Sequence, residues 1–427
     1  MQARRAIAAS IALTLIAPAV FAQAVAPAPV PPPPALDPVS LLVGQLDLDK
    51  YKASIKGLTQ FGDRRQGTER NRKALDWIAA QLKSYGCAPE RLPYQYTQPA
   101  PDAPAPQRAP GLPSGGAGGP AGQGGSTLFG ERAPTGVNSD PLRQPDQRLR
   151  ALNAEPTPVG TSLREDVYCT KVGTTHPEEM YIVSAHMDGI GFGEAANDDG
   201  SGTALVMELA RIFSAPGVGT ERSIRFALWN NEESGLNGAA AYVEQRKGLQ
   251  GIESPKGSGQ YPEPKWLGMI QHDMMLFDHG MPVPQTDAAG KPLLDGQGRQ
   301  VYAPPKQQRR EADVNIEFQA ASKQAEGAAK LAWALRAAND KYASNYPAAV
   351  GFHMTNTDST PFMDLVPAIS LRENERGQQI GAGWNPHWHQ PTDLYSNYSD
   401  QDFLLGLNAA QTTLAGVARL SGARIER

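Results

Sequence analysis

One stretch of the sequence decides the fold, and it reads MYIVSAHMDGIGFGEAANDDGSGTALVMELARIF, residues 180–213. Residues 180–185 form an apolar run of the kind that a buried β-strand shows. Residues 202–213 indicate a helix, because their apolar side chains recur on one face: Leu205, Leu209 and Ile212. A strand followed by a helix is the repeating unit of α/β proteins.

The same alternation continues along the chain. An amphipathic helix is expected at residues 70–85, and Gly86 is placed to end it. Further strands are expected at 223–229, 266–271, 314–318 and 368–371, and further helices at 236–245, 328–342 and 402–420. Alternating strands and helices predict an α/β fold with helices on both faces of a central sheet.

The composition narrows the class of protein. The 427 residues carry a net charge of -4 and show no basic stripe, so we expect no nucleic-acid partner. Such a weak charge also argues against electrostatic binding to a membrane. We expect no stable membrane association and no obligate protein partner.

The N-terminus, residues 1–22, is typical of a signal peptide. Arg4 and Arg5 precede a short apolar run, and Ala22 ends a small-residue cleavage site. The alternative is a membrane anchor, but the run is short for a bilayer and Pro18 interrupts it. We therefore predict export, to the periplasm or the medium.

Two segments are rich in proline, alanine or glycine. Residues 23–36 are expected to be a disordered spacer, and residues from about 98 to 146 a flexible surface insertion. A lid over the functional site is the alternative for the insertion. The remainder, residues 37–427, is expected to form a single domain that contains the insertion.

Cys87 and Cys169 are the only two cysteines. In an exported protein two cysteines suggest one disulfide, and two buried free thiols are the alternative. The chain lacks the paired Cys-x-x-Cys spacing that a structural zinc site would need.

Residues able to carry chemistry follow the predicted strands where these end. They are His186 and Asp188 after the first strand, Glu232 and Glu233 after the second, Asp273 after the third, Asp198 before a helix, and His389 in a late loop. Open α/β sheets place their sites at such strand ends. Clustered carboxylates and imidazoles repel or desolvate one another unless a cation lies between them. Without thiolates this set suits zinc, with manganese or cobalt as substitutes, and five candidate ligands suit two metals.

Each of these residues also has a plain structural alternative. His186 alone is compatible with a hydrogen-bonded surface histidine. Asp198 is compatible with a helix cap, although Asp199 is equally suited to that role. His387 lies two residues before His389 and is an alternative ligand.

Five segments in order resemble the M28 family of zinc peptidases, which includes secreted bacterial aminopeptidases. They are SAHMD at 184–188, NDDGSG at 197–202, NEESGL at 231–236, HDM at 272–274, and His389 with Asp393 four residues later. The resemblance implies a three-layer zinc-exopeptidase fold, with a central mixed, mostly parallel twisted sheet flanked by helices. It also implies that residues 37–427 form one catalytic peptidase domain.

The resemblance implies a role for each residue. The expected ligands are His186 and Asp273 on one zinc, Glu233 and His389 on the other, and Asp198 bridging both. Glu232 would be the general base for a hydroxide bridging the metals, and Asp188 would orient His186. A cis peptide bond is expected between Asp198 and Asp199.

Two positions depart from the family pattern. Trp388 stands where many members have tyrosine, and Ser359 where many have histidine. Hydrolysis of N-terminal residues from peptides is the leading function. The alternatives on the same fold are a glutamate-releasing carboxypeptidase, for which Arg372 and Arg376 are candidate carboxylate-binding residues, a glutaminyl cyclase, and a metal-free binding module.

Overall fold

The computed structural model describes residues 37–100, 137–277, 283–294, 296, 301–303, 314–352, 354, 356–373, 385 and 387–425. These residues fall within one compact unit, Asp37–Arg427. The predicted signal peptide and the spacer at 23–36 lie outside the described residues, as does most of the predicted insertion. No helix within the described ranges is long and apolar enough to cross a membrane.

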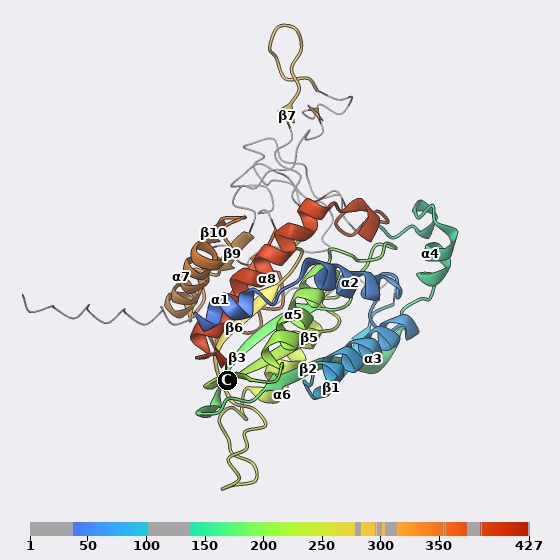
Figure 1. Cartoon of the computed structure of the whole chain (residues 1–427). Coiled ribbons are helices and arrows are strands. Elements are labelled where there is room, and N and C mark those ends of the chain that lie inside the picture. Colours follow the sequence, from blue (N-terminus) through green and yellow to red (C-terminus); the bar gives the residue numbers. More distant parts are fainter. Residues whose placement is uncertain are drawn as a thin grey trace, which may run out of the picture. The chain divides into compact units, whose positions relative to one another are not determined.

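Eight strands form a central mixed sheet in the order β1-β2-β5-β3-β6-β11-β9-β10 (Figure 1). Their bounds are β1 Pro89–Gln98, β2 Gly160–Lys171, β3 His176–His186, β5 Arg222–Trp229, β6 Lys265–His272, β9 Val314–Phe318, β10 Ala348–Gly351 and β11 Ala368–Arg372. The four central strands, β5, β3, β6 and β11, run parallel to one another. Strands β1 and β2 add antiparallel pairs at one side, and β9 pairs antiparallel with β11 at the other.

The described helices flank this sheet (Figure 1). Their bounds are α1 Pro38–Val43, α2 Leu48–Thr59, α3 Glu69–Ser84, α4 Gln147–Leu152, α5 Gly200–Phe213, α6 Asn237–Arg246, α7 Ala325–Tyr342 and α8 Asp400–Leu420. Short elements complete the description: β4 Val218–Gly219, β7 Val283–Pro284, β8 Tyr302–Ala303, β12 Arg424–Ile425, and the 3-10 turns Pro141–Arg143 and Tyr395–Asn397. The α/β class predicted from the sequence is confirmed.

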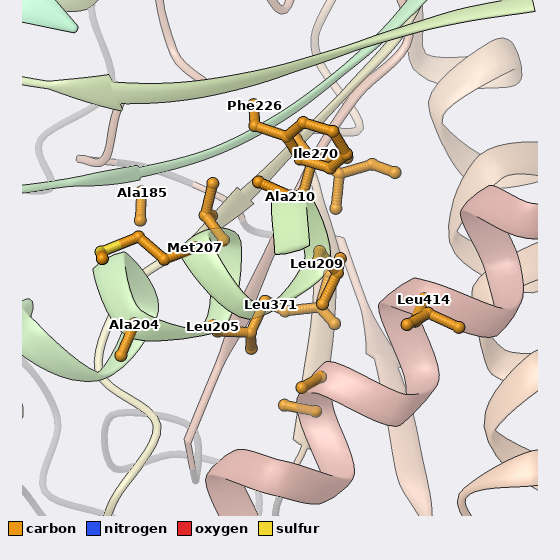
Figure 2. Close-up of a cluster of buried hydrophobic side chains, with 14 of the residues drawn as sticks. Ala185, Ala204, Leu205, Met207, Leu209, Ala210, Phe226, Ile270, Leu371 and Leu414 are labelled. Carbon is orange, nitrogen blue, oxygen red and sulfur yellow. The ribbon is translucent and has the colours of Figure 1, made fainter. Parts of the chain in front are cut away.

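The sheet separates two apolar cores because side chains alternate along each strand. On β3, Val183 and Ala185 face the larger core, whereas Met180 and Ile182 face the smaller one. Helix α5 packs on the larger core through Leu205, Leu209 and Ile212, the stripe predicted from the sequence. Figure 2 shows part of this core. Helix α6 covers the opposite face through Ala239, Tyr242 and Val243.

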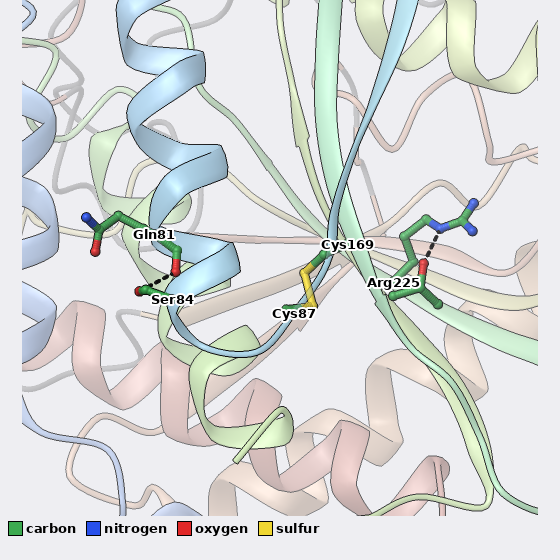
Figure 3. Close-up of a disulfide and its surroundings, with 6 residues drawn as sticks. Gln81, Ser84, Cys87, Cys169 and Arg225 are labelled. Carbon is green, nitrogen blue, oxygen red and sulfur yellow. Dashed lines mark hydrogen bonds between the residues drawn. A yellow bond between two sulfur atoms is a disulfide. The ribbon is translucent and has the colours of Figure 1, made fainter. Parts of the chain in front are cut away.

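A disulfide joins Cys87 to Cys169 (Figure 3). Cys87 follows α3, and Cys169 lies near the end of β2, at a sequence separation of 82. Both cysteines are buried. The bond therefore links the turn between α3 and β1 to strand β2 of the central sheet.

The sequence did not predict strands β1 and β2 or helices α1 and α2. Residues 137–146, the last part of the predicted flexible insertion, also differ from expectation. They contain a 3-10 turn at Pro141–Arg143 and two buried side chains, Asn138 and Gln144. These side chains form hydrogen bonds to neighbouring loops, which explains why this part is packed.

Candidate active site

Three neighbouring strands bring predicted site residues to one edge of the sheet. Strand β3 ends at His186, and Asp273 directly follows β6. Glu232 and Glu233 follow the end of β5 after two asparagines. Because these strands are parallel, their carboxyl ends lie side by side.

The site residues surround a small cavity that opens to solvent. Its walls are formed by His186, Asp198, Glu232, Glu233, Asp273, Asn356, Trp388 and His389. The structure therefore brings all five predicted ligands and the predicted base together. Asn356 is a wall residue that the sequence did not predict, because it stands in none of the motifs singled out above.

Asp198 lies between two histidines. Its Oδ1 is 3.3 Å from Nε2 of His186, and its Oδ2 is 3.0 Å from Nε2 of His389. Two further carboxylates complete the cluster: Asp273 Oδ1 lies 3.8 Å from His186 Nε2, and Glu233 Oε2 lies 2.9 Å from His389 Nε2. Each histidine thus faces one oxygen of Asp198 and one further carboxylate, which is Asp273 for His186 and Glu233 for His389.

These separations fit a metal centre. The ligand atoms of a tetrahedral zinc with bonds of about 2.0–2.2 Å lie roughly 3.3–3.6 Å apart. The four separations, from 2.9 to 3.8 Å, bracket that range. Oε1 of Glu233 is buried without a hydrogen-bond partner in the described part of the chain. Zinc bound by these side chains would satisfy such an oxygen.

His186 is oriented by backbone rather than by a carboxylate. Its Nδ1 lies 3.0 Å from the carbonyl oxygen of Asp188 and 3.9 Å from the Asp188 carboxylate. A carbonyl only accepts, so Nδ1 carries the proton and Nε2 presents a lone pair to the cavity. The Asp188 carboxylate instead accepts the backbone N–H of Glu232, at 3.0 Å. The Asp188 carboxylate therefore anchors the backbone of Glu232, the expected base.

Asp393 holds the segment that carries Asp198. Its two oxygens accept the backbone N–H groups of Asn197 and Asp198, at 2.9 and 3.1 Å. Tyr398 donates its hydroxyl to the same carboxylate, at 2.9 Å. The peptide bond between Asp198 and Asp199 is cis, at the position for which the resemblance predicted one.

Arg372 pairs with Asp273. Its Nη2 lies 3.1 Å from Asp273 Oδ2 and also donates to the carbonyl oxygen of Asn356, at 3.2 Å. Both partners of the ion pair are buried. Strand pairing explains the contact, since Leu371 is in register with His272 on the neighbouring strand. Arg372, considered above for a substrate carboxylate, is thus engaged with an expected ligand, and Arg376 lies outside the described residues.

Burial and crowding shift the pKa values of the cluster. Burial alone would lower the pKa of His186, but the carboxylates of Glu232 and Asp198 outweigh burial and raise it well above its ordinary value. Burial, aided by the charge of Glu233, raises the pKa of Glu232 well above the usual range. Burial also raises the pKa of Glu233 to about 7. Without a cation, His186, Glu232 and Glu233 therefore favour bound protons. Burial also acts to raise the pKa of Asp198, but His186 and His389 outweigh it and lower that pKa well below its usual range.

Other predicted residues lie apart from the cavity wall. His387, the alternative ligand, contacts the hydroxyl of Thr392 through Nδ1 at 2.9 Å. His272 is buried between the carbonyl of Ser184 and the hydroxyl of Thr413, which is a structural role.

Comparison with known proteins identifies the family. The sequence model of peptidase family M28 matches residues 166–411, more than half of the chain. The chain belongs to peptidase family M28. The matched region contains all the predicted ligands, the expected base and Asp393, so the M28 resemblance found in the sequence is confirmed.

Individual M28 relatives match over shorter stretches. The chain is 38% identical to carboxypeptidase Q of Xenopus laevis over 76 residues, which are 18% of this chain and 16% of the relative. It is 42% identical to aminopeptidase YwaD of Bacillus subtilis over 69 residues, 16% of this chain and 14% of the relative. The matches thus span less than a fifth of either relative.

The fold matches that of solved structures. An aminopeptidase from Aneurinibacillus sp. strain AM-1 superposes with a TM-score of 0.55 at 19% sequence identity. That superposition covers 91% of this chain and 97% of the other. The three-layer fold implied by the M28 resemblance is confirmed.

Proposed function

We propose that the protein is an exported two-zinc aminopeptidase, which releases N-terminal residues from peptides. Membership of peptidase family M28 supports peptide-bond hydrolysis. The disulfide between Cys87 and Cys169 supports an oxidising compartment, in agreement with the predicted signal peptide. The compartment is therefore the periplasm or the medium.

The side chains of the cavity wall carry the choice of the N-terminus. Four carboxyl groups line the cavity, whereas no lysine or arginine lines it among the described residues. Arg372 is buried against Asp273 and donates to a backbone carbonyl. Two bound zinc ions would neutralise the four carboxylates, so the choice rests on the cationic side chains missing from the described part of the wall, which a C-terminal carboxylate would need as partners.

The arrangement of the ligands supports two zinc ions, for which manganese or cobalt could substitute. His186 and Asp273 would hold one ion, Glu233 and His389 the other, and the two oxygens of Asp198 would bridge them. Bound zinc would supply a Lewis acid that polarises the scissile carbonyl and lowers the pKa of water.

The chain itself supplies the proton transfers. Glu232 lines the cavity but makes none of the short contacts to histidine that Glu233 makes. Its carboxylate is therefore available to take a proton from the attacking water and return it to the leaving amine. The hydrogen bond from its backbone to Asp188 keeps this base in place.

A panel of peptides tests the proposal. Peptides with free ends, with a blocked N-terminus and with a blocked C-terminus are incubated with the enzyme, with and without a chelator. Cleavage lost on N-blocking but kept on C-blocking supports an aminopeptidase, and the opposite result indicates a carboxypeptidase. Ammonia release from N-terminal glutamine without peptide cleavage indicates a cyclase. Activity that survives complete metal removal would contradict the zinc mechanism.

A further inference from the structure

Residues 137–146, called the strap from here on, lie against the loop that carries His389. The strap forms the end of the Pro/Gly-rich segment identified in the sequence. Asn138 is 4% exposed and Gln144 is fully buried, whereas Leu142 in the same strap is 73% exposed. The strap therefore has one face turned to the protein and one to solvent.

The buried face makes hydrogen bonds to two loops. The backbone N–H of Asn138 donates to the carbonyl oxygen of His389, at 3.0 Å. Nε2 of Gln144 donates to the carbonyls of Pro391 and Phe192, at 2.9 and 2.8 Å. Because Oε1 of Gln144 accepts the backbone N–H of Asp146, its amide nitrogen is directed toward these carbonyls. One side chain thus ties the His389 loop to the loop between β3 and α5.

Both loops have backbones that need such support. His389 has a φ of 55° and Phe192 a φ of 67°, in the left-handed region that side chains rarely adopt. Residues in this region keep their conformation only where their surroundings enforce it. The loops also touch closely: a Cβ added to Gly191 would lie 2.5 Å from the carbonyl carbon and oxygen of His389.

The position of the imidazole depends on this backbone. His389 Nε2 lies within 3.0 Å of Asp198 and Glu233, so a small movement of its loop would separate the expected ligands. We propose that Gln144 is a positioning residue that acts through the carbonyls of Phe192 and Pro391 to hold His389 in its metal-binding position. This inference rests on the proposed function, because it takes His389 as a zinc ligand. The strap thereby becomes part of the zinc site without contacting zinc.

The test compares Gln144→Met with Leu142→Ala in the full chain. Methionine keeps the length and volume of glutamine but donates no hydrogen bond, and Leu142 is the exposed control in the same strap. Zinc release to a chromogenic chelator, kcat and KM are measured for both variants. Mutating a residue that holds a metal ligand in place typically lowers metal affinity or activity about 10- to 100-fold. We expect Gln144→Met to release zinc at least about tenfold faster and to lose activity mainly in kcat. We expect Leu142→Ala to match the wild type.

The rate of zinc release distinguishes a role of Gln144 in positioning His389 from a role in the stability of the fold alone. If Gln144→Met lowers the melting temperature in chelator yet releases zinc at the wild-type rate, the proposal is wrong. If that variant does not fold, Gln144→Ala replaces it, because this change also removes the two hydrogen bonds to Phe192 and Pro391 but leaves a smaller side chain beside their carbonyls. Unchanged zinc release from folded Gln144→Ala would then overturn the proposal. A wild-type protein without zinc would instead overturn the proposed function, which is a distinguishable outcome.

Discussion

Replacing Glu232 with glutamine separates catalysis from metal binding. The two side chains are isosteric, and the backbone of residue 232 stays bonded to Asp188, so the loop is expected to keep its shape. General acid–base groups contribute about 10²- to 10⁴-fold to rate. At about 1.4 kcal/mol per tenfold, the barrier should rise by about 3–5 kcal/mol. The expected result is full zinc content with kcat reduced by at least about a hundredfold.

The neighbouring residue provides a matched control. Glu233 Oε2 lies 2.9 Å from His389 Nε2, so Glu233→Gln should lose zinc as well as activity. Zinc is measured by mass spectrometry on the same preparations used for kcat with an unblocked peptide substrate. Glu232 has an oxygen within 4.8 Å of donor atoms of His186 and Asp273, a spacing that also permits ligation. Loss of zinc from Glu232→Gln, or substantial activity in the zinc-loaded variant, would therefore refute its role as an unliganded base.

Three further predictions concern the supports of the site and the fold. Arg372→Lys keeps the charge beside Asp273, but lysine cannot also reach Asn356 as the guanidinium does. The variant should keep zinc yet lose about 10- to 100-fold in kcat/KM. Wild-type kinetics would contradict a role for Arg372 in positioning Asp273. Burial raises the pKa of Glu373 to about 7. The folded protein therefore keeps a proton on Glu373 that the unfolded chain, with its usual pKa of 4.5, has already released. The contribution of Glu373 to wild-type stability consequently falls as pH rises from about 4.5 to 7. Chelator-treated Glu373→Gln should gain about 3 kcal/mol relative to wild type across that window in urea unfolding, and a constant difference would exclude this cause. The Cys87→Ala, Cys169→Ala double variant should lose about 4–5 kcal/mol of unfolding free energy, because the bond closes a loop of 82 residues, and an unchanged urea midpoint would show that the bond adds no stability.

The strand ends were predictable because local pattern determines them. His186 directly follows the apolar residues of β3, and Asp273 follows those of β6, so an apolar run located each ligand. The same reasoning missed β1 and β2. In β1 only Leu92 and Tyr94 are buried, and β2 carries charged residues into the interior, including Asp166. Neither strand shows an apolar run, and both depend on pairing with distant partners.

Within the site, several contacts escaped prediction. Arg372 was considered for substrate binding, and only the pairing of β11 with β6 reveals its contact with Asp273. Asp188 was expected to use its carboxylate on His186, but its carbonyl makes the shorter contact. The buried role of Gln144 had no signal, since it lies in a segment whose composition is typical of disorder.

Asp198 contacts histidines that lie far apart in the sequence, and this has a consequence for the order of folding. His186 ends a strand early in the family region, whereas His389 precedes the last long helix, α8. Contacts with such large sequence separation form late, because the intervening chain must first be ordered. A chain still emerging from synthesis therefore lacks part of its proposed zinc site. Hydrolytic activity should therefore appear only after the chain has been made as far as His389 and the whole sheet is assembled.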